Sequence, residues 1–327
     1  MLKLIRITRG GPENVQNRKA PYLQSIKFRS VPDAGTRVAT LESGESLLID
    51  EVAEPDYARL KADNRFGFVE APRRGLGVGL FINVHQPPTH ELAVRQALQW
   101  AVDRRGIVDK LFFGVHKVAS GPLSESVWGR DEKFERIYGY DPNKAQQILD
   151  DAGWKASAAG VIREKNGAKL AMSLVSFRSP WHEMADPVQA QLRAVGIDAQ
   201  VQKMERGAYL DFVRAFKHNL CSSAGTDIDV DQLRLRYHSS NRPSANFSNL
   251  DDPALDALLV KGSQQDIGSA ERLQTYEQVQ QKLMDLLPFV SVMSQVRVEG
   301  MSSKVHGLKM GPDGLNAFGL TDVWIEP

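Results

Sequence analysis

The sequence predicts an α/β fold, and two observations support this prediction. Segments with the alternating or continuous apolar character of β-strands take turns along the chain with segments whose apolar residues recur every three or four positions, as in helices. The composition is that of a globular protein, since 42% of the 327 residues are hydrophobic and 25% are charged. A chain of this size can bury a large core, so we expect mixed sheets flanked by helices.

The N-terminal segment predicts an irregular lead-in followed by a strand–helix–strand unit. Residues 1–20 are basic and rich in Gly and Asn, and residues 25–31 alternate like a half-buried strand. Asp33 can cap a short helix that ends near Leu41, and residues 47–49 are apolar enough for another short strand. Such a unit predicts a right-handed parallel crossover.

An apolar run over residues 76–84 predicts a central strand that is buried on both faces. Its glycines lack the GxGxxG spacing of a nucleotide-binding turn, and we interpret them as positions of close packing or bending. The clearest helix signal of the chain follows, with Thr89 as its expected cap and with Val94 and Leu98 on its apolar face.

Strands and helices are expected to alternate through the rest of the chain. Capping residues mark the starts of several helices, namely Asp103, Asp141, Asp252 and Ser269. The expected helices cover residues 142–152, 253–260 and 270–286. Three further helices are expected: one that begins after residue 103, one that ends near residue 195 and one that includes residues 212–216. The expected strands are 170–176, 197–203, 219–223 and 289–293, and the remainder is expected to be irregular with short strands.

Charge and cysteine content limit the classes of partner. The 41 Lys and Arg residues balance 40 Asp and Glu residues, so there is no electrostatic case for a nucleic-acid partner. The single cysteine, Cys221, cannot form an internal disulfide, and its apolar surroundings predict a small buried residue. Charges interrupt the apolar pairs of residues 1–9, so no secretory signal peptide is predicted in this chain, and no window has the length and apolarity of a membrane span.

The motifs of common enzyme and cofactor sites are not found. The seven histidines form no HExxH pair, and the sequence has no GK[ST] phosphate loop and no GxSxG nucleophile turn. No cofactor is therefore predicted. The alternating carboxylates Asp227, Asp229 and Asp231 could gather charge for a metal ion or for acid–base catalysis, which leaves a metal-assisted hydrolase as an alternative function. A polar loop that caps the helix around Leu233 is the other interpretation of these carboxylates.

The segment 177–181 predicts a recognition site rather than a catalytic one. It directly follows an expected strand, and ligands of open α/β sheets bind beyond the carboxyl ends of strands. Arg178 offers a planar fork for a carboxylate, while Phe177 and Trp181 supply apolar walls. An ordinary surface turn with an exposed arginine is the alternative.

A series of short motifs resembles the extracytoplasmic solute-binding proteins of ABC transporters, in the peptide and nickel class. Each motif is weak, but their order and spacing between residues 21 and 307 make the resemblance strong. The motifs are 28–34 (Phe-Arg-Ser-Val-Pro-Asp-Ala), 41–45 (Leu-Glu-Ser-Gly-Glu), 81–83 (Phe-Ile-Asn), 94–98 (Val-Arg-Gln-Ala-Leu), 101–104 (Ala-Val-Asp-Arg), 140–142 (Tyr-Asp-Pro), 152–154 (Ala-Gly-Trp) and 246–248 (Asn-Phe-Ser).

The resemblance implies a type II periplasmic-binding-protein fold, in which two lobes close over a ligand. It implies one complete lobe plus part of the other, with residues 21–82 and 289–327 in lobe I and residues 83–288 in lobe II. The strands near Asn83 and Phe289 would cross between the lobes.

The resemblance also implies candidate ligand-binding residues. Arg178 matches the arginine that meets the peptide carboxylate in dipeptide-binding relatives, flanked by Phe177 and Trp181. Ser223 and Thr226 match a tryptophan and the aspartate that neutralises the peptide amine, and Asp227 is one residue from that position. Asn83, at the end of the central strand, completes the candidate set. The loss of the amine-binding carboxylate makes an anionic or opine-like solute plausible beside peptides.

By resemblance, the chain is therefore expected to be the periplasmic substrate-binding component of an ABC importer. Its partners would be a small-molecule or peptide ligand and a membrane permease, with no enzymatic activity. A truncated, non-transporting remnant is a further alternative, and its incomplete lobe would expose sheet edges and favour self-association.

Overall fold

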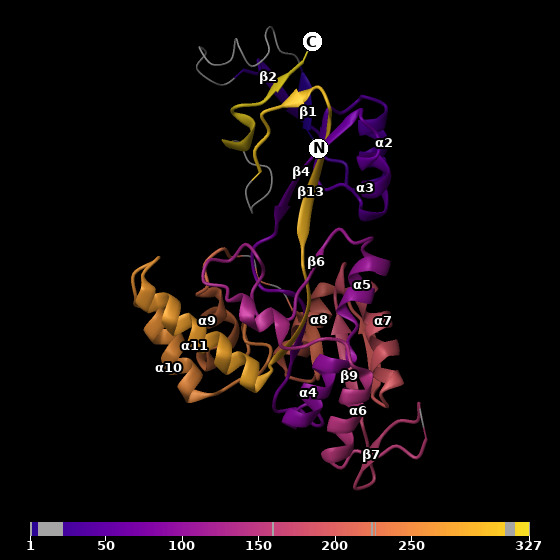
Figure 1. The fold of residues 1–327 in the computed structure, drawn as a ribbon, viewed down its shortest axis with the longest axis vertical. Helices are drawn as coiled ribbons and strands as arrows, with labels where there is room; N and C mark the ends of the chain where they lie inside the picture. Colours follow the sequence, from indigo (N-terminus) through magenta and orange to yellow (C-terminus); the bar gives the residue numbers. More distant parts are fainter. Residues whose placement is uncertain are drawn as a thin grey trace. The chain divides into compact units, whose positions relative to one another are not determined.

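The computed structural model describes residues 2–5, 22–158, 160–223, 225, 227–310 and 318–326, and gives the backbone alone for residues 2–5, 223 and 318. The chain divides into two compact units, which we describe separately (Figure 1). Unit 1 comprises Met1–Arg73, Phe112–His116 and Gln295–Pro327, and unit 2 comprises Arg74–Leu111 and Lys117–Ser294.

Unit 2 is built on a mixed six-stranded sheet with the order β10-β9-β11-β5-β12-β6. Strands β9, β10 and β11 run parallel to one another, whereas β5 is antiparallel to both β11 and β12. The bounds are β5 Val78–Ile82, β6 Lys117–Val118, β9 Ala171–Ser176, β10 Asp198–Lys203, β11 Leu220–Ser223 and β12 Phe289–Ser294. A two-stranded ribbon, β7 Glu164–Lys165 with β8 Ala168–Lys169, lies apart from this sheet.

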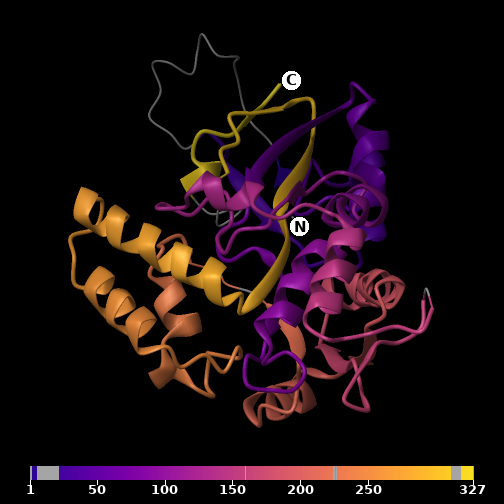
Figure 2. The ribbon, with the colours of Figure 1, turned by 60° about the horizontal axis from the view of Figure 1, so that its bottom comes forward.

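Helices cover the sheet of unit 2. They are α4 Leu92–Ala101, α5 Arg104–Leu111, α6 Pro142–Asp151, α7 Trp181–Ala194, α8 Arg206–Arg214, α9 Gln232–Tyr237, α10 Pro253–Ser263 and α11 Ala270–Leu286, with 3-10 turns at Glu132–Arg136 and Ser239–Asn241. Figure 2 shows α10 and α11 side by side. One core cluster joins α8–α11 to the sheet and includes Phe81, Val175, Tyr209, Tyr237, Tyr276 and Phe289.

The central strand β5 confirms the expected role of its glycines. All its residues are buried, and a Cβ on Gly79 would collide with the backbone carbonyl of Val290 on the neighbouring β12. The glycine therefore allows the close approach of the two strands.

Side-chain caps appear at most of the expected helix starts. Asp141, Asp252 and Ser269 each accept a hydrogen bond from the backbone three residues on, at 2.8–3.1 Å. The expected Thr89 cap is wrong, because α4 begins only at Leu92. The Thr89 hydroxyl instead donates to the carbonyl of Asn83 at 2.7 Å and lies 2.8 Å from that of Gln86.

Unit 1 contains an antiparallel five-stranded sheet with the order β2-β1-β3-β13-β4. The bounds are β1 Leu2–Ile5, β2 Ser25–Phe28, β3 Leu48–Ile49, β4 Phe66–Pro72 and β13 Val296–Ser302, with helices α2 Ala34–Glu42 and α3 Glu54–Lys61. A small pair, β14 Val305–His306 with β15 Trp324–Ile325, and a 3-10 turn at Phe318–Leu320 complete the unit.

Two expectations for unit 1 need correction. Residues 2–5 of the expected irregular lead-in form β1, and the rest of that lead-in lies outside the described residues. The expected crossover joins β2 and β3, which are parallel to each other because both are antiparallel to β1. They are not neighbours, however, since β1 lies between them.

The division of the chain differs from the expected lobe boundaries. Strands β5 and β12, expected to cross between lobes, both belong to the sheet of unit 2, and the division falls at 73/74 and 294/295. The assignment of lobes stays a prediction. Within the described ranges, every helix is too short or too polar to cross a membrane.

Candidate functional site

Two loops leave the unit 2 sheet at the same edge. Strands β9 and β11 are parallel neighbours, with Leu220 opposite Leu174 and Cys221 opposite Val175. The segment beginning at Phe177 and the loop after Ser223 therefore both start at the carboxyl ends of adjacent strands, which is where open α/β sheets hold ligands.

Three aromatic side chains gather where β9 ends, and we call Phe177, Trp181 and Tyr209 the aromatic cluster. The ring of Phe177 stacks on Trp181 with centroids 5.8 Å apart, and it lies 4.7 Å from the ring of Tyr209. Trp181 is only 4% exposed as the first residue of α7. The Tyr209 hydroxyl donates to the carbonyl of Ser222 at 3.0 Å, which ties α8 to the end of β11.

Arg178 lies on the outer side of the aromatic cluster. Its guanidinium carbon is 5.1 Å from the centroid of Phe177 and 5.3 Å from that of Trp181, so the cation rests against both rings. The side chain is exposed, and no carboxylate of the described residues pairs with it. The arrangement leaves a positive fork open to solvent beside aromatic rings, and a ligand-binding role for it stays a prediction.

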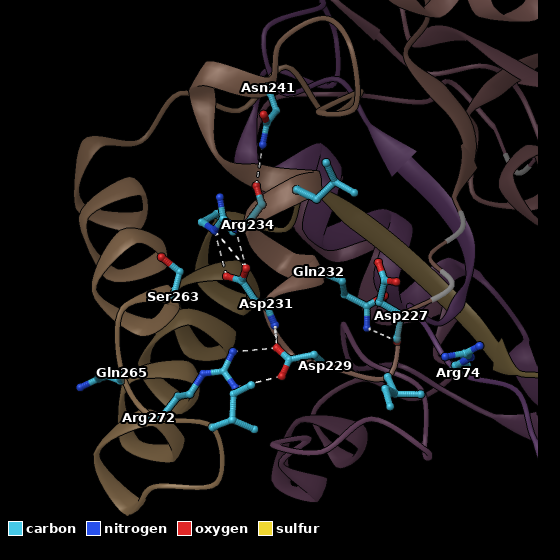
Figure 3. Close-up of a pocket in the computed structure, with 13 residues that line it drawn as sticks. Arg74, Asp227, Asp229, Asp231, Gln232, Arg234, Asn241, Ser263, Gln265 and Arg272 are labelled. Atoms are coloured by element: carbon cyan, nitrogen blue, oxygen red, sulfur yellow. Dashed lines mark hydrogen bonds and ion pairs between the residues drawn. The ribbon is translucent and has the colours of Figure 1, made fainter. Parts of the chain in front are cut away.

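The loop after β11 lines a pocket of about 630 Å³ (Figure 3). Its walls come from this loop, from α9 and from the facing ends of α10 and α11. Asp227 is exposed at the rim, and its carbonyl accepts a hydrogen bond from the Gln232 amide at 3.0 Å. The pocket thus contains one of the candidate binding residues.

The carboxylates deeper in the loop are used within the fold. Arg272, buried on α11, holds both oxygens of Asp229 at 2.7 and 2.9 Å, and Arg234 pairs with Asp231 at 2.7 Å (Figure 3). Partial burial would raise the pKa of Asp229, but hydrogen bonds from Arg272 and from the backbone of Asp231 outweigh it and hold that pKa below its usual range.

The three aspartates do not form a metal site. Asp229 and Asp231 point to different arginines, and no group of three or more His, Cys, Asp or Glu side chains among the described residues could hold a metal ion. The capping interpretation holds for Asp229, which accepts a hydrogen bond from the Asp231 backbone at 2.7 Å, but not for Asp231, which stands at the N-cap position of α9 without a side-chain cap bond. The metal-assisted hydrolase is therefore not supported.

Asn83 is built into the interior rather than into a ligand surface. It is 1% exposed, and its amide donates to the carbonyls of Phe216 and His218, both at 3.1 Å. These bonds occupy both amide hydrogens, which favours a structural role. Of the other candidates, Ser223 ends β11 opposite Gly79, and Thr226 lies outside the described residues.

Two arginines near the site are not predicted by the sequence analysis. Arg272 occupies the buried face of α11 with Tyr276 and Val279, a spacing that could have indicated a buried ion pair. Arg236 follows Leu233 by three positions on α9 and lies half-buried. An arginine at a core position of a helix is the signal that could have drawn attention to both.

Comparison with known proteins agrees with this architecture. Residues 13–244, well over half of the chain, match the family described as bacterial extracellular solute-binding proteins, family 5 middle. The chain belongs to this family. Members are solute-binding proteins, so the family also agrees with a site that binds rather than catalyses.

Individual relatives match nearly the whole chain. A dipeptide-binding protein of Pseudomonas aeruginosa is 28% identical over 94% of this chain and 55% of its own length, and heme-binding protein A of Haemophilus influenzae is 29% identical over the same shares. The crystal structure of NikA from Brucella suis in complex with Fe(III)-EDTA superposes with a TM-score of 0.81, at 24% identity, over 95% of this chain and 63% of that one.

These matches show the type II periplasmic-binding-protein fold expected from the sequence. The chain spans about half the length of the curated relatives it matches. The relatives' names cover a dipeptide and heme, so membership alone does not specify the solute.

Proposed function

We propose that this protein is a substrate-binding component of an ABC importer, and that it binds a small solute at the carboxyl ends of β9 and β11. The observation that carries the proposal is Arg178, a solvent-exposed cation resting on Phe177 and Trp181. The family supports it, since relatives are named for binding dipeptides and heme. The proposal includes a periplasmic location for this protein and delivery of its solute to a membrane permease.

Recognition in this site needs no covalent step. The guanidinium of Arg178 would form paired hydrogen bonds with an anionic group, while the aromatic cluster would cover the apolar part of the solute. Asp227, and with it Thr226 and Ser223, would add polar contacts from the neighbouring loop. An anionic compound is favoured over a cationic one because the exposed cation lacks a carboxylate partner among the described residues.

Isothermal titration calorimetry of the purified chain tests the proposal. The panel comprises di- and tripeptides, opines, heme and the nickel–histidine chelate, and we expect saturable binding of at least one anionic member. Arg178→Ala should weaken that binding about 10-fold or more, since a charge-assisted hydrogen bond is worth about 1.5–3 kcal/mol.

A matched control is Arg193→Ala. Arg193 is also an exposed arginine of unit 2, but it lies near the opposite end of α7 from Trp181, with Asp198 at 3.7 Å. Its variant should bind like the wild type. Tight binding that survives Arg178→Ala unchanged would contradict the assignment of this residue.

Self-association through unit 1 also stays a proposal. Phe28 ends the edge strand β2 and is 65% exposed, and an exposed edge with a large apolar side chain favours pairing between chains.

A further inference from the structure

We propose that Arg236 is a second anion-binding residue of this site, and that it holds a carboxylate of the solute near Tyr209 of the aromatic cluster. This inference rests on the proposed function and makes the solute class more specific: a carboxylate next to an apolar or aromatic group. Arg178 would then guide or contact the solute from the outer side, at the exposed surface of the same rings.

Arg236 lies at the border between the core of unit 2 and solvent. It lies on the short helix α9 between Leu233 and Tyr237, which are 0% and 1% exposed and belong to the core of unit 2. Arg236 itself is half-buried, so part of the residue meets solvent although its Nε does not. The proposal is that a small solute reaches the guanidinium from this exposed part.

The charge of Arg236 has no close partner. Within the described part of the chain, Arg236 makes no ion pair, and its Nε is fully buried without a hydrogen-bond acceptor. Asp227 acts on it electrostatically but does not pair with it, and burial lowers the pKa of the guanidinium. Its helix neighbour Arg234, by contrast, is paired with Asp231.

Electrostatics link Arg236 with the proposed site. Its charge acts on Tyr209 of the aromatic cluster and on Asp227 of the neighbouring loop, and Tyr209 lies against Phe177. Arg178 rests against Phe177 and Trp181 of the same cluster. Two cations therefore interact with the aromatic cluster, through different rings.

A second orphan donor belongs to the same cluster. The indole nitrogen of Trp181 is buried and lacks a hydrogen-bond partner among the described residues. Indole and guanidinium groups donate only, so an acceptor is what each of them lacks. Buried donors without acceptors cost free energy, and an incoming carboxylate would offset that cost for Arg236.

The test measures, for each variant, the affinity for a carboxylate ligand and the stability without ligand. The probes are the dipeptide Ala-Phe and its C-terminal amide. The variants are Arg236→Gln, Arg178→Ala and the control Arg193→Gln, and each is measured by calorimetry and by thermal unfolding without ligand. We expect Arg236→Gln to bind the acid about 10- to 100-fold more weakly, and to bind the amide about as well as the wild type does. Its unfolding midpoint without ligand should stay unchanged or rise, because an unpaired, half-buried charge has been removed.

A structural role for Arg236 predicts a different pattern. The midpoint would then fall by several degrees, and the acid and the amide would lose affinity equally, which would overturn the inference. Wild-type affinity of Arg236→Gln for the acid, or equal wild-type affinity for acid and amide, would also overturn it. If the wild type binds neither probe but binds another member of the calorimetric solute panel, the inference is overturned and the proposed function stands. If the wild type binds no member of that panel, the proposed function itself is contradicted.

Discussion

Arg272 and Arg178 show two ways in which unit 2 uses an arginine. Arg272 is 3% exposed, donates to the carbonyl of Gly262 at 3.1 Å and holds Asp229 with two further bonds. Arg178 is exposed and contacts ring faces. The first is locked into the fold through a paired carboxylate, whereas the second keeps its hydrogen-bonding edge available to a ligand.

Removing the carboxylate that pairs with Arg272 should destabilise the fold. Asp229→Ala leaves the buried Arg272 guanidinium without its counter-ion, and we expect a loss of about 2–3 kcal/mol in the free energy of unfolding. Urea denaturation measures this loss. Asp227→Ala, two residues away but exposed, is the control and should change stability by less than about 0.5 kcal/mol. Equal effects of the two variants would contradict the structural role of Asp229.

Glu299 in unit 1 makes stability depend on pH. It is completely buried, accepts from Arg297 Nε at 2.6 Å and from the Glu51 backbone at 3.0 Å, and burial raises its pKa to about 7. The folded state therefore binds this proton more tightly than the unfolded chain, whose pKa is the ordinary 4.5. The stability linked to this proton is present below pH 4.5 and is lost as pH rises to about 7.

Glu299→Gln tests that dependence. The variant mimics the protonated side chain, so its stability should match the wild type near pH 4.5 and exceed it above pH 7, by a difference on the order of 2–3 kcal/mol. Urea denaturation of both proteins at several pH values gives this difference. If the two stability curves stay parallel between pH 4.5 and 8, Glu299 does not titrate as stated.

At the scale of elements, the approach of β5 to β12 depends on a missing side chain. Gly79→Ala would push its Cβ into the Val290 carbonyl, and overpacking of this kind costs about 1–3 kcal/mol. Gly207→Ala on α8 has open space around its Cβ and should instead stabilise the protein, by up to about 1 kcal/mol. Thermal unfolding of both variants checks the opposite signs, and a shift in the same direction would contradict this account of β5.

Elements with local signals are predictable from the sequence. Helix α11 has the expected bounds because Ser269 caps its start and Pro288 follows its end. Helix α3 is not predicted because Leu60 is its only fully buried residue, which leaves no apolar period. Strand β13 is also missed, since it is stabilised by pairing with β4, more than two hundred residues away in sequence.

The candidate site likewise has one part with a local sequence signal and another part that depends on contacts distant in sequence. The segment from Phe177 to Trp181 is recognisable because it follows a strand, which is a local feature. Whether an arginine is paired, as Arg272 is, or lacks a partner, as Arg236 does among the described residues, depends on helices that meet only in the folded chain. Sequence reasoning therefore identifies one cation of the proposed site and misses the other.

At the scale of the whole molecule, the chain belongs to a family of solute-binding proteins, and it spans about half the length of its curated relatives. Unit 2 contains a complete mixed sheet with its helices and all the described residues of the proposed site. Solute binding is therefore expected to depend on the loops after β9 and β11, with a stoichiometry of one solute per chain.

The central claim is that this chain binds a small anionic solute through Arg178, and calorimetric titration of the solute panel into the wild type and Arg178→Ala tests it most directly. The account predicts saturable one-to-one binding of at least one anionic solute, weakened about 10-fold or more in the variant. Absence of binding by every member of the panel, or binding that Arg178→Ala leaves unchanged, would contradict it.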